Sequence, residues 1–260
     1  MKYGFIGCGN MGGALIRAAA KQTKDIMIAD FDKQKAQALA DELGLIAAEN
    51  KTIASNCDRI FLGVKPQVMA QMLEGIKDIL SDKKPTLITM AAGLSSQKIK
   101  EMSGDLPVIR IMPNTPVSVG KGVILYCSNG VEDTVVNDFV NDMQQSGKLY
   151  YLDENLIDAG CSVSGCGPAF MYTFVSAVAK GGEECGLSCS QAIEFAAATM
   201  AGAAEMLLTS NKTPEALTDA VCSKGGSTIE GVNTLKNSEF ENIVINCIKA
   251  AYKRNKELGE

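Results

Sequence analysis

The chain has 260 residues, 46% of them hydrophobic and 21% charged, which is the composition of a globular protein with one or two domains. Its net charge of −5 and its lack of a basic run argue against nucleic acid and anionic membranes as partners. Nine cysteines, without a CxxC pair or any histidine, exclude the usual zinc patterns, so we expect no metal. Reduced thiols, and first residues that enter a strand instead of a signal peptide, predict a cytoplasmic protein.

The opening stretch predicts a dinucleotide-binding turn. An apolar strand from Tyr3 to Ile6 ends in Gly7-x-Gly9-x-x-Gly12, and a helix follows over 14–20. In this arrangement the first glycine makes a tight turn, the second lets a pyrophosphate approach the backbone, and the third lets helix and strand pack closely. The amides of the helix N-terminus then bind the phosphates. The glycine triplet alone is also compatible with an ordinary turn.

Strands and helices alternate up to residue 151. Strands are expected over 25–29, 59–64, 86–91, 108–111, 122–126 and 148–151, and helices over 33–43, 67–80, 95–102 and 131–144. This alternation predicts an α/β domain with a doubly wound, mostly parallel sheet over residues 1–153. The carboxyl ends of its strands should line a ligand crevice.

From residue 154 onward strand signals are nearly absent. Helices are expected over 154–163, 168–185, 190–209, 214–221, 227–236 and 239–258, which makes 154–260 an all-helical second domain. The helix over 190–209 is apolar around most of its circumference and needs cover on all sides. We infer an oligomer with intertwined helices; the alternative is a central helix within one subunit. The apolar runs 168–179 and 192–208 are too short or too interrupted to span a bilayer.

Several residues at the predicted strand ends are candidates for cofactor binding. Asp30 follows the second strand, where a carboxylate accepts hydrogen bonds from ribose hydroxyls and repels a 2′-phosphate, which favours NADH. The neighbouring Asp32 is alternatively a simple helix cap. Gly63-Val64-Lys65-Pro66 and Ala91-Ala92-Gly93 end the third and fourth strands, and their small residues would let a cofactor lie against the backbone. Lys65 is alternatively an ordinary solvated lysine.

A second glycine-rich stretch, from Val221 to Gly231, lies between two predicted helices. Its amides, with the hydroxyls of Ser223, Ser227 and Thr228, would form a carboxylate site without an arginine; the alternative is an ordinary capped turn.

The lack of histidine bears on the reaction. Alcohol–ketone dehydrogenases need a side chain that carries a proton, and Met171 stands where β-hydroxyacid dehydrogenases have lysine. A cyclic imine needs no such carrier, because its iminium form already holds the proton.

With these residues in place, the chain resembles the pyrroline-5-carboxylate reductase family along its whole length. The motifs that carry the resemblance are Gly4-Phe5-Ile6-Gly7-x-Gly9-x-Met11-Gly12, Val64-Lys65-Pro66-Gln67, Ala91-Ala92-Gly93, Arg110-x-Met112-Pro113-Asn114-Thr115-Pro116, Ser164-Gly165-x-Gly167-Pro168-Ala169-Phe170 and Ser223-x-Gly225-Gly226-x-Thr228. The last three in combination are specific to that family.

The resemblance implies a Rossmann domain, a helical dimerisation domain, and dimers that often assemble into decamers. It implies NAD(P)H-dependent reduction of 1-pyrroline-5-carboxylate to L-proline, at a site between the domains that includes helices from a neighbouring subunit. The dinucleotide would contact Gly7, Cys8, Gly9, Asn10, Met11, Gly12, Asp30, Asn50, Val64, Lys65, Pro66, Ala92, Met112 and Asn114. The substrate would contact Val221, Ser223, Gly225, Gly226, Ser227 and Thr228, with the catalytic Thr228 hydroxyl near the ring nitrogen.

Three departures from the family pattern stand out. Lys224 replaces a frequent proline and Cys166 a usual serine, and neither change removes a hydroxyl with an assigned role. Asp30 replaces Ser, Asn or Arg, so NADPH and NADH both stay open, with Asp30 favouring NADH. Two other functions are compatible with the sequence: a reductase of a related cyclic imino acid, and a dinucleotide-binding sensor without catalysis.

Overall fold

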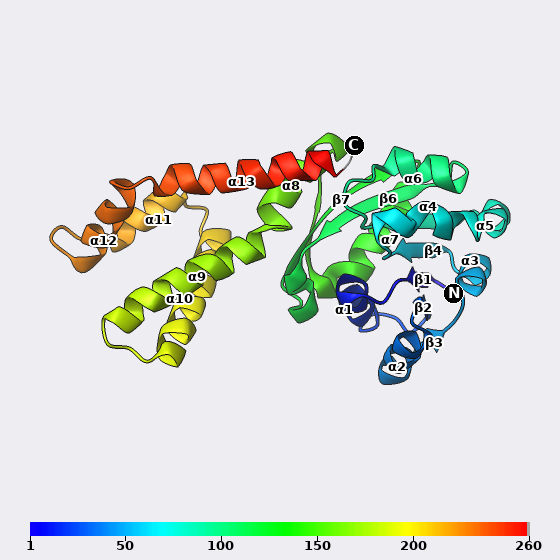
Figure 1. Ribbon diagram of the computed structural model, residues 1–260, viewed down its shortest axis with the longest axis horizontal. Coiled ribbons are helices and arrows are strands. Elements are labelled where there is room, and N and C mark those ends of the chain that lie inside the picture. The colour runs from blue at the N-terminus through cyan, green and yellow to red at the C-terminus, as the bar shows by residue number, and fades with distance from the viewer. Residues whose placement is uncertain (259–260) are drawn as a thin grey trace. The chain divides into compact units, whose positions relative to one another are not determined.

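The computed structural model describes residues 1–258. The chain divides into two compact units (Figure 1). Among the described residues, the first comprises 1–166 and 251–258, and the second comprises Gly167–Ala250. Relative to the predicted domains, the helix that follows residue 154 and the last turns of the chain group with the first unit. The predicted domain boundary after residue 153 stays a prediction, and the compact units divide after residue 166.

The first unit is built on one eight-stranded sheet with the order β3-β2-β1-β4-β5-β6-β7-β8. Its strands are β1 Tyr3–Ile6, β2 Ile26–Ala29, β3 Ile46–Ala47, β4 Arg59–Leu62, β5 Thr86–Thr89, β6 Val108–Pro113, β7 Gly122–Asn129 and β8 Gly147–Tyr151. The pairs from β3 to β6 are parallel, β7 is antiparallel to β6, and β8 is parallel to β7. The predicted mostly parallel, doubly wound sheet is confirmed. Its order reverses at β1, and the crevice beside such a reversal is where ligands of these sheets bind.

Helices cover both faces of this sheet (Figure 1). They are α1 Asn10–Ala19, α2 Lys33–Leu43, α3 Asn50–Asn56, α4 Pro66–Glu74, α5 Lys77–Lys83, α6 Ser96–Ser103, α7 Asp133–Met143 and α8 Ile157–Ser164, with 3-10 turns η1 Thr115–Val119, η2 Gln144–Ser146 and η3 Glu154–Leu156. Successive residues of a strand point to opposite faces, so Phe5 and Phe61 stack in one core with ring centroids 4.1 Å apart, whereas Ile6 and Leu62 belong to the other. Burial on both faces explains the continuous apolar runs of these strands.

Three local expectations were wrong or incomplete. The two-residue strand β3 and the helix α3 were not predicted, because β3 is too short to show a period and α3 has only Ile53 and Ala54 buried. The helix expected over 67–80 is two helices, since Gly75 ends α4 and α5 starts at Lys77. By contrast α2 ends as predicted at Gly44, which adopts the left-handed conformation with φ 65°.

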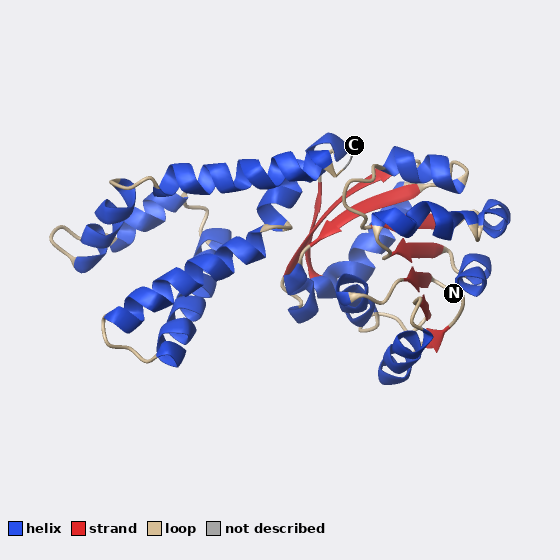
Figure 2. Ribbon diagram, in the orientation of Figure 1, coloured by secondary structure: helices blue, strands red, loops and turns tan. Residues whose placement is uncertain are grey.

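The second unit is helical throughout, and the strands in Figure 2 all belong to the first unit. Its helices are α9 Gly167–Glu184, α10 Cys189–Thr209, α11 Pro214–Val221, α12 Ser227–Lys236 and α13 Phe240–Glu257, the last of which ends in the first unit. Ser188 and Gln191 form a capping box that starts α10. Within α10 only Ala192 is buried, and Phe195 and Leu208 are 53% and 62% exposed. The single chain therefore leaves this apolar helix uncovered, which excludes the alternative of a helix buried within one subunit.

Candidate functional site

The three glycines of the turn between β1 and α1 differ in their surroundings: Gly7 and Gly12 are packed against backbone, and Gly9 is open. Gly7 has φ +109°, and a Cβ on it would lie 2.5 Å from the Gly63 carbonyl oxygen. A Cβ on Gly12 would lie 2.2 Å from the Gly7 oxygen, so both positions need glycine for the close approach of backbone to backbone. A Cβ on Gly9 would meet no atom within 4 Å. Packing does not account for glycine at this position, whereas room for a ligand against the backbone does.

The N-terminus of α1 supplies the complementary polar groups. Gly9 is the N-cap residue, and no side chain caps the helix. The first amides of an α-helix have no partner within it and carry the positive end of the helix dipole. The open side of Gly9 and these amides together fit a pyrophosphate, so the first unit has the features that a nicotinamide dinucleotide requires.

Asp30 holds the glycine turn in place. Its Oδ2 accepts a hydrogen bond from the Cys8 amide at 2.6 Å, and its Oδ1 accepts one from the Asp32 amide at 3.0 Å. Burial and the Asp30 charge raise the pKa of the Cys8 thiol to about 11, so this thiol is neutral at physiological pH. Asp32 in turn accepts the amides of Gln34 and Lys35 at 3.1 Å each, which confirms the alternative in which it caps α2.

Two cavities lie within the first unit, and the second of them adjoins the glycine turn. One of about 660 Å³ lies at the carboxyl ends of β2 and β3 and is lined by Asp30 and Asn50, two of the predicted cofactor residues. Lys33 and Glu49, which also line it, form an exposed ion pair at 2.8 Å. The other, of about 440 Å³, is lined by residues that include Gly9, Asn10, Arg17, Lys35 and Ser118.

The remaining predicted cofactor residues follow neighbouring strands. Val64, the exposed Lys65 and Pro66 lie after β4, with Lys65 as the N-cap of α4, and the exposed Ala92 lies after β5. The carboxyl ends of parallel strands meet at one sheet edge, so these residues share that edge with the glycine turn.

Met112 and Asn114, at the end of β6, already have structural partners. Met112 is buried in an apolar cluster with Leu125 and Ile157. The Asn114 Oδ1 accepts the Val123 amide at 2.8 Å, and its Nδ2 donates to the Ser164 carbonyl at 3.0 Å. Asn114 thus ties β7 to the end of α8, a role that sequence reasoning missed.

The predicted substrate loop lies in the second unit. The Gly226 amide donates to the Ser223 carbonyl at 3.0 Å, and Gly225 adopts φ +74°, which closes a tight turn ahead of α12. Gly226 is the N-cap of α12 without a side-chain cap, and a Cβ there would lie 2.6 Å from the Ser223 Oγ. Val221, Ser223, Ser227 and Thr228 are exposed. Helix α12 therefore starts without the side-chain cap of an ordinary capped turn, and anion binding by its first amides stays a prediction.

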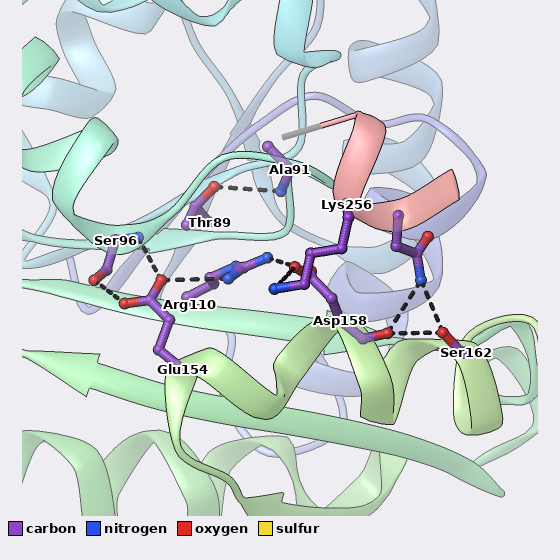
Figure 3. Close-up of polar contacts among 9 residues, drawn as sticks. Thr89, Ala91, Ser96, Arg110, Glu154, Asp158, Ser162 and Lys256 are labelled. Atoms are coloured by element: carbon purple, nitrogen blue, oxygen red, sulfur yellow. Dashed lines mark hydrogen bonds and ion pairs between the residues drawn. The ribbon is translucent and has the colours of Figure 1, made fainter. Parts of the chain in front are cut away.

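An ion network around the buried Arg110 joins the sheet to η3 and α8 (Figure 3). Arg110 on β6 is 4% exposed and pairs with Glu154 at 3.3 Å and Asp158 at 3.1 Å. Glu154 also accepts the amide of Ser96 at 2.6 Å and its hydroxyl at 2.5 Å. Sequence reasoning missed this network, although two acids four residues apart lie on one helical face and signal a shared partner.

Two further findings concern metals and membranes. Among residues 1–258, no group of three or more His, Cys, Asp or Glu side chains is placed to hold a metal ion.

By length and composition alone, the helical stretches Glu154–Glu184 and Cys189–Thr209 would qualify as membrane spans. The expectation from sequence that the apolar runs 168–179 and 192–208 are too short or too interrupted to span a bilayer does not hold for the longer helical stretches that contain them, since both pass on length and composition.

Two family models match separate segments of the chain. Residues 154–258 match the family model described as pyrroline-5-carboxylate reductase dimerisation, and residues 2–93 match that described as NADP oxidoreductase, coenzyme F420-dependent. A pyrroline-5-carboxylate reductase of Aquifex aeolicus is 34% identical over 99% of this chain and 97% of its own length. That of Escherichia coli is 35% identical over 100% and 98%.

Solved structures agree with the sequence comparison. A Plasmodium falciparum pyrroline carboxylate reductase with NADP bound is 31% identical, with a TM-score of 0.88 over 100% of this chain and 98% of its own. A Coxiella burnetii pyrroline-5-carboxylate reductase is 28% identical with a TM-score of 0.93 over the same shares. An imine reductase of Bacillus cereus, 16% identical with a TM-score of 0.52, shares the fold alone.

Proposed function

The chain belongs to the pyrroline-5-carboxylate reductase family. We propose that the N-termini of α1 and α12, which both have glycine as the N-cap residue, bind the two reactants of that family's reaction. The chain is an oxidoreductase that reduces 1-pyrroline-5-carboxylate to L-proline with a nicotinamide dinucleotide, in the last step of proline biosynthesis. The observation that carries the residue assignments is geometric. Both helices start at a glycine without a side-chain cap, and each glycine follows a tight turn.

In the first unit, α1 would bind the dinucleotide pyrophosphate at the open side of Gly9. Asp30 would accept hydrogen bonds from the adenosine ribose, and Asn50 lines the same cavity. The predicted residues Val64, Lys65 and Ala92 would flank the cofactor from the adjoining strand ends. When bound, the reduced nicotinamide supplies a hydride.

In the second unit, the amides that open α12 would bind the substrate carboxylate, together with the Ser223 and Ser227 hydroxyls. The exposed Thr228 hydroxyl would orient the ring nitrogen. No side chain has to deliver a proton, since the iminium form of the substrate carries its own. The chain's contribution to the rate is then mainly the fixed orientation of the two reactants.

For the cofactor, we propose a preference for NADH over NADPH. A 2′-phosphate at the ribose would meet the Asp30 carboxylate, and like charges at such contact distances repel. The nearby Lys33 forms an exposed ion pair with Glu49, whose carboxylate would compete with an added phosphate for the lysine. Parallel assays of NADH and NADPH oxidation with pyrroline-5-carboxylate test this. We expect a higher kcat/KM for NADH than for NADPH. In an Asp30→Ser variant the ratio of these two kcat/KM values should be smaller. A higher kcat/KM for NADPH in the wild type would refute the proposal.

The same assays decide between this substrate and its six-membered analogue. We expect pyrroline-5-carboxylate to give the higher kcat/KM, because the relatives named for it match along the full chain. Folded protein that binds dinucleotide but oxidises it with neither ring would overturn the assignment of the substrate residues.

The chain forms an oligomer through its dimerisation domain. We propose that a second copy, not lipid, covers α10, with the dimer as the minimal unit and further assembly to a decamer. The groove of about 580 Å³ between α9 and α10 is almost wholly apolar and would receive a helix of the partner. We also propose that the protein is cytoplasmic and has no membrane attachment. Light scattering measures the mass directly: monomers or detergent dependence would refute the proposal, and a dimer would exclude the decamer.

A further inference from the structure

Phe31 is the most exposed of the large apolar side chains in residues 1–258, with a relative exposure of 106%. It stands between Asp30 and Asp32 in the turn that follows β2. A phenylalanine left in water forgoes the favourable transfer from water that burial of its ring provides. Single exposed apolar side chains are common on protein surfaces, so it is the surroundings of Phe31 that point to a role for its ring.

The turn holds Phe31 outward through fixed backbone contacts. Asp30 accepts the amide of Asp32 at 3.0 Å on one side and that of Cys8 at 2.6 Å on the other. Asp32 accepts two amides of α2 in turn. The backbone before and after Phe31 is thus tied to the glycine turn and to α2, and the ring is presented by an ordered turn.

Phe31 also lines the cavity of about 660 Å³ that contains Asp30. This volume is in the range of small-molecule sites, roughly 300–1,000 Å³. The cavity combines apolar walls with side-chain amides: its lining includes Ala36, Ala48, Met72 and Ile76, and also Gln37, Asn50 and Gln71. A flat aromatic base with polar edges matches such a lining better than a purely apolar or purely ionic ligand.

We propose that Phe31 is a recognition residue that stacks on the adenine ring of the dinucleotide. Two adjacent side chains of one turn then bind the adenosine half of the dinucleotide: Phe31 contacts the base and Asp30 the ribose hydroxyls. This inference rests on the proposed function, since it uses the same ribose position. Stacking of a base on an aromatic ring is sequence-tolerant and strong enough that its loss by truncation weakens binding by about 5- to 150-fold.

The first test uses the absence of tryptophan from the chain. A Phe31→Trp variant carries one tryptophan at the proposed stacking position, and Tyr150→Trp carries one on β8, at the other end of the sheet. Titration with 5′-AMP should quench the tryptophan at position 31 saturably, and nicotinamide mononucleotide, which lacks adenine, should not. The tryptophan at position 150 should respond to neither. No quenching at position 31 by concentrations of 5′-AMP that occupy the site would overturn the proposal.

The second test measures affinity by calorimetry with ADP-ribose. We expect Phe31→Ala to bind about 5- to 150-fold more weakly and Phe31→Tyr to bind like the wild type, with unchanged thermal unfolding in both because the ring is exposed. KM for the dinucleotide should rise in Phe31→Ala while kcat stays close to wild type. Equal affinity of Phe31→Ala and the wild type would overturn the proposal and leave the proposed function standing. Failure of the wild type itself to bind ADP-ribose would instead overturn the proposed function, and the stacking role with it.

Discussion

Replacement of Gly9 by alanine separates the two explanations of the glycine turn. Gly9 has φ −62° and ψ −175°, which alanine adopts without strain, and its Cβ would meet no atom within 4 Å. Loss of a favourable N-cap residue costs about 0.5–1 kcal/mol, and the reduced freedom of the unfolded chain offsets about 0.4–1 kcal/mol. We therefore expect the free energy of unfolding to change by less than about 1 kcal/mol.

Dinucleotide affinity should respond quite differently. If a pyrophosphate occupies the open side of Gly9, the new methyl group enters a filled space, which typically costs about 1–3 kcal/mol. This corresponds to binding that is about 5- to 150-fold weaker. Calorimetric titration with ADP-ribose measures the affinity, and thermal unfolding measures the stability of the same samples.

Two matched variants make the result interpretable. In Gly13→Ala the added Cβ would lie 3.5 Å from the Cys8 carbonyl oxygen, an ordinary contact, so affinity should persist. In Gly12→Ala it would lie 2.2 Å from the Gly7 oxygen, so stability and affinity should fall together. The reasoning is refuted if Gly9→Ala binds ADP-ribose as tightly as the wild type, or if it loses stability as Gly12→Ala does.

Three further outcomes are expected. Thr228→Ala should lower kcat by about ten- to a thousandfold, or about 1.4–4 kcal/mol, with dinucleotide affinity unchanged and activity largely restored in Thr228→Ser; unaltered kcat would remove Thr228 from the site. Glu154→Gln should lower the free energy of unfolding, measured in urea, by about 1.5–3 kcal/mol, because it weakens the charged network around the buried Arg110. The control Glu257→Gln removes a charge from the exposed pair with Arg254 and should change that free energy by less than about 1 kcal/mol. Equal losses of unfolding free energy in Glu154→Gln and Glu257→Gln would show that burial of Arg110 does not strengthen its ion pairs. Stability should also fall as pH rises from about 8.5 to 11, since burial raises thiol pKa values to about 11 and the unfolded chain releases those protons first; a flat profile of urea midpoints would show that burial does not shift them. The thiols concerned are Cys8, Cys57, Cys127 and Cys161.

Sequence reasoning predicted the features that depend on nearby residues. The glycine turn, the Gly44 cap and the helix α11 from Pro214 to Val221 all have local signals, and each occurs as expected. The family motifs extended the prediction to the reaction, because they combine short patterns that rarely coincide by chance.

Features that depend on distant partners were not predictable in this way. The Asn114 amide bonds to residues 9 and 50 positions away, which no local pattern records. Arg110 pairs with acids 44 and 48 positions away, and the spacing of Glu154 and Asp158 signals a shared partner without identifying it. The strand β3 owes its existence to pairing with β2 and has too few residues for a period. The exposure of Phe31 is likewise a property of the folded turn, since an apolar residue beside a buried strand reads as core.

The uncovered surface of α10 makes the folding of this protein a second-order process. A newly made chain can close its sheet alone, yet its helical half presents bare apolar side chains until it meets another copy. Dimerisation with another copy then competes with aggregation with other chains that expose apolar surface. The fraction of chains that dimerise depends on the local concentration of newly made copies. Refolding yield should accordingly pass through a maximum as concentration rises: too dilute a solution leaves chains unpartnered, and too crowded a one favours aggregation over pairing.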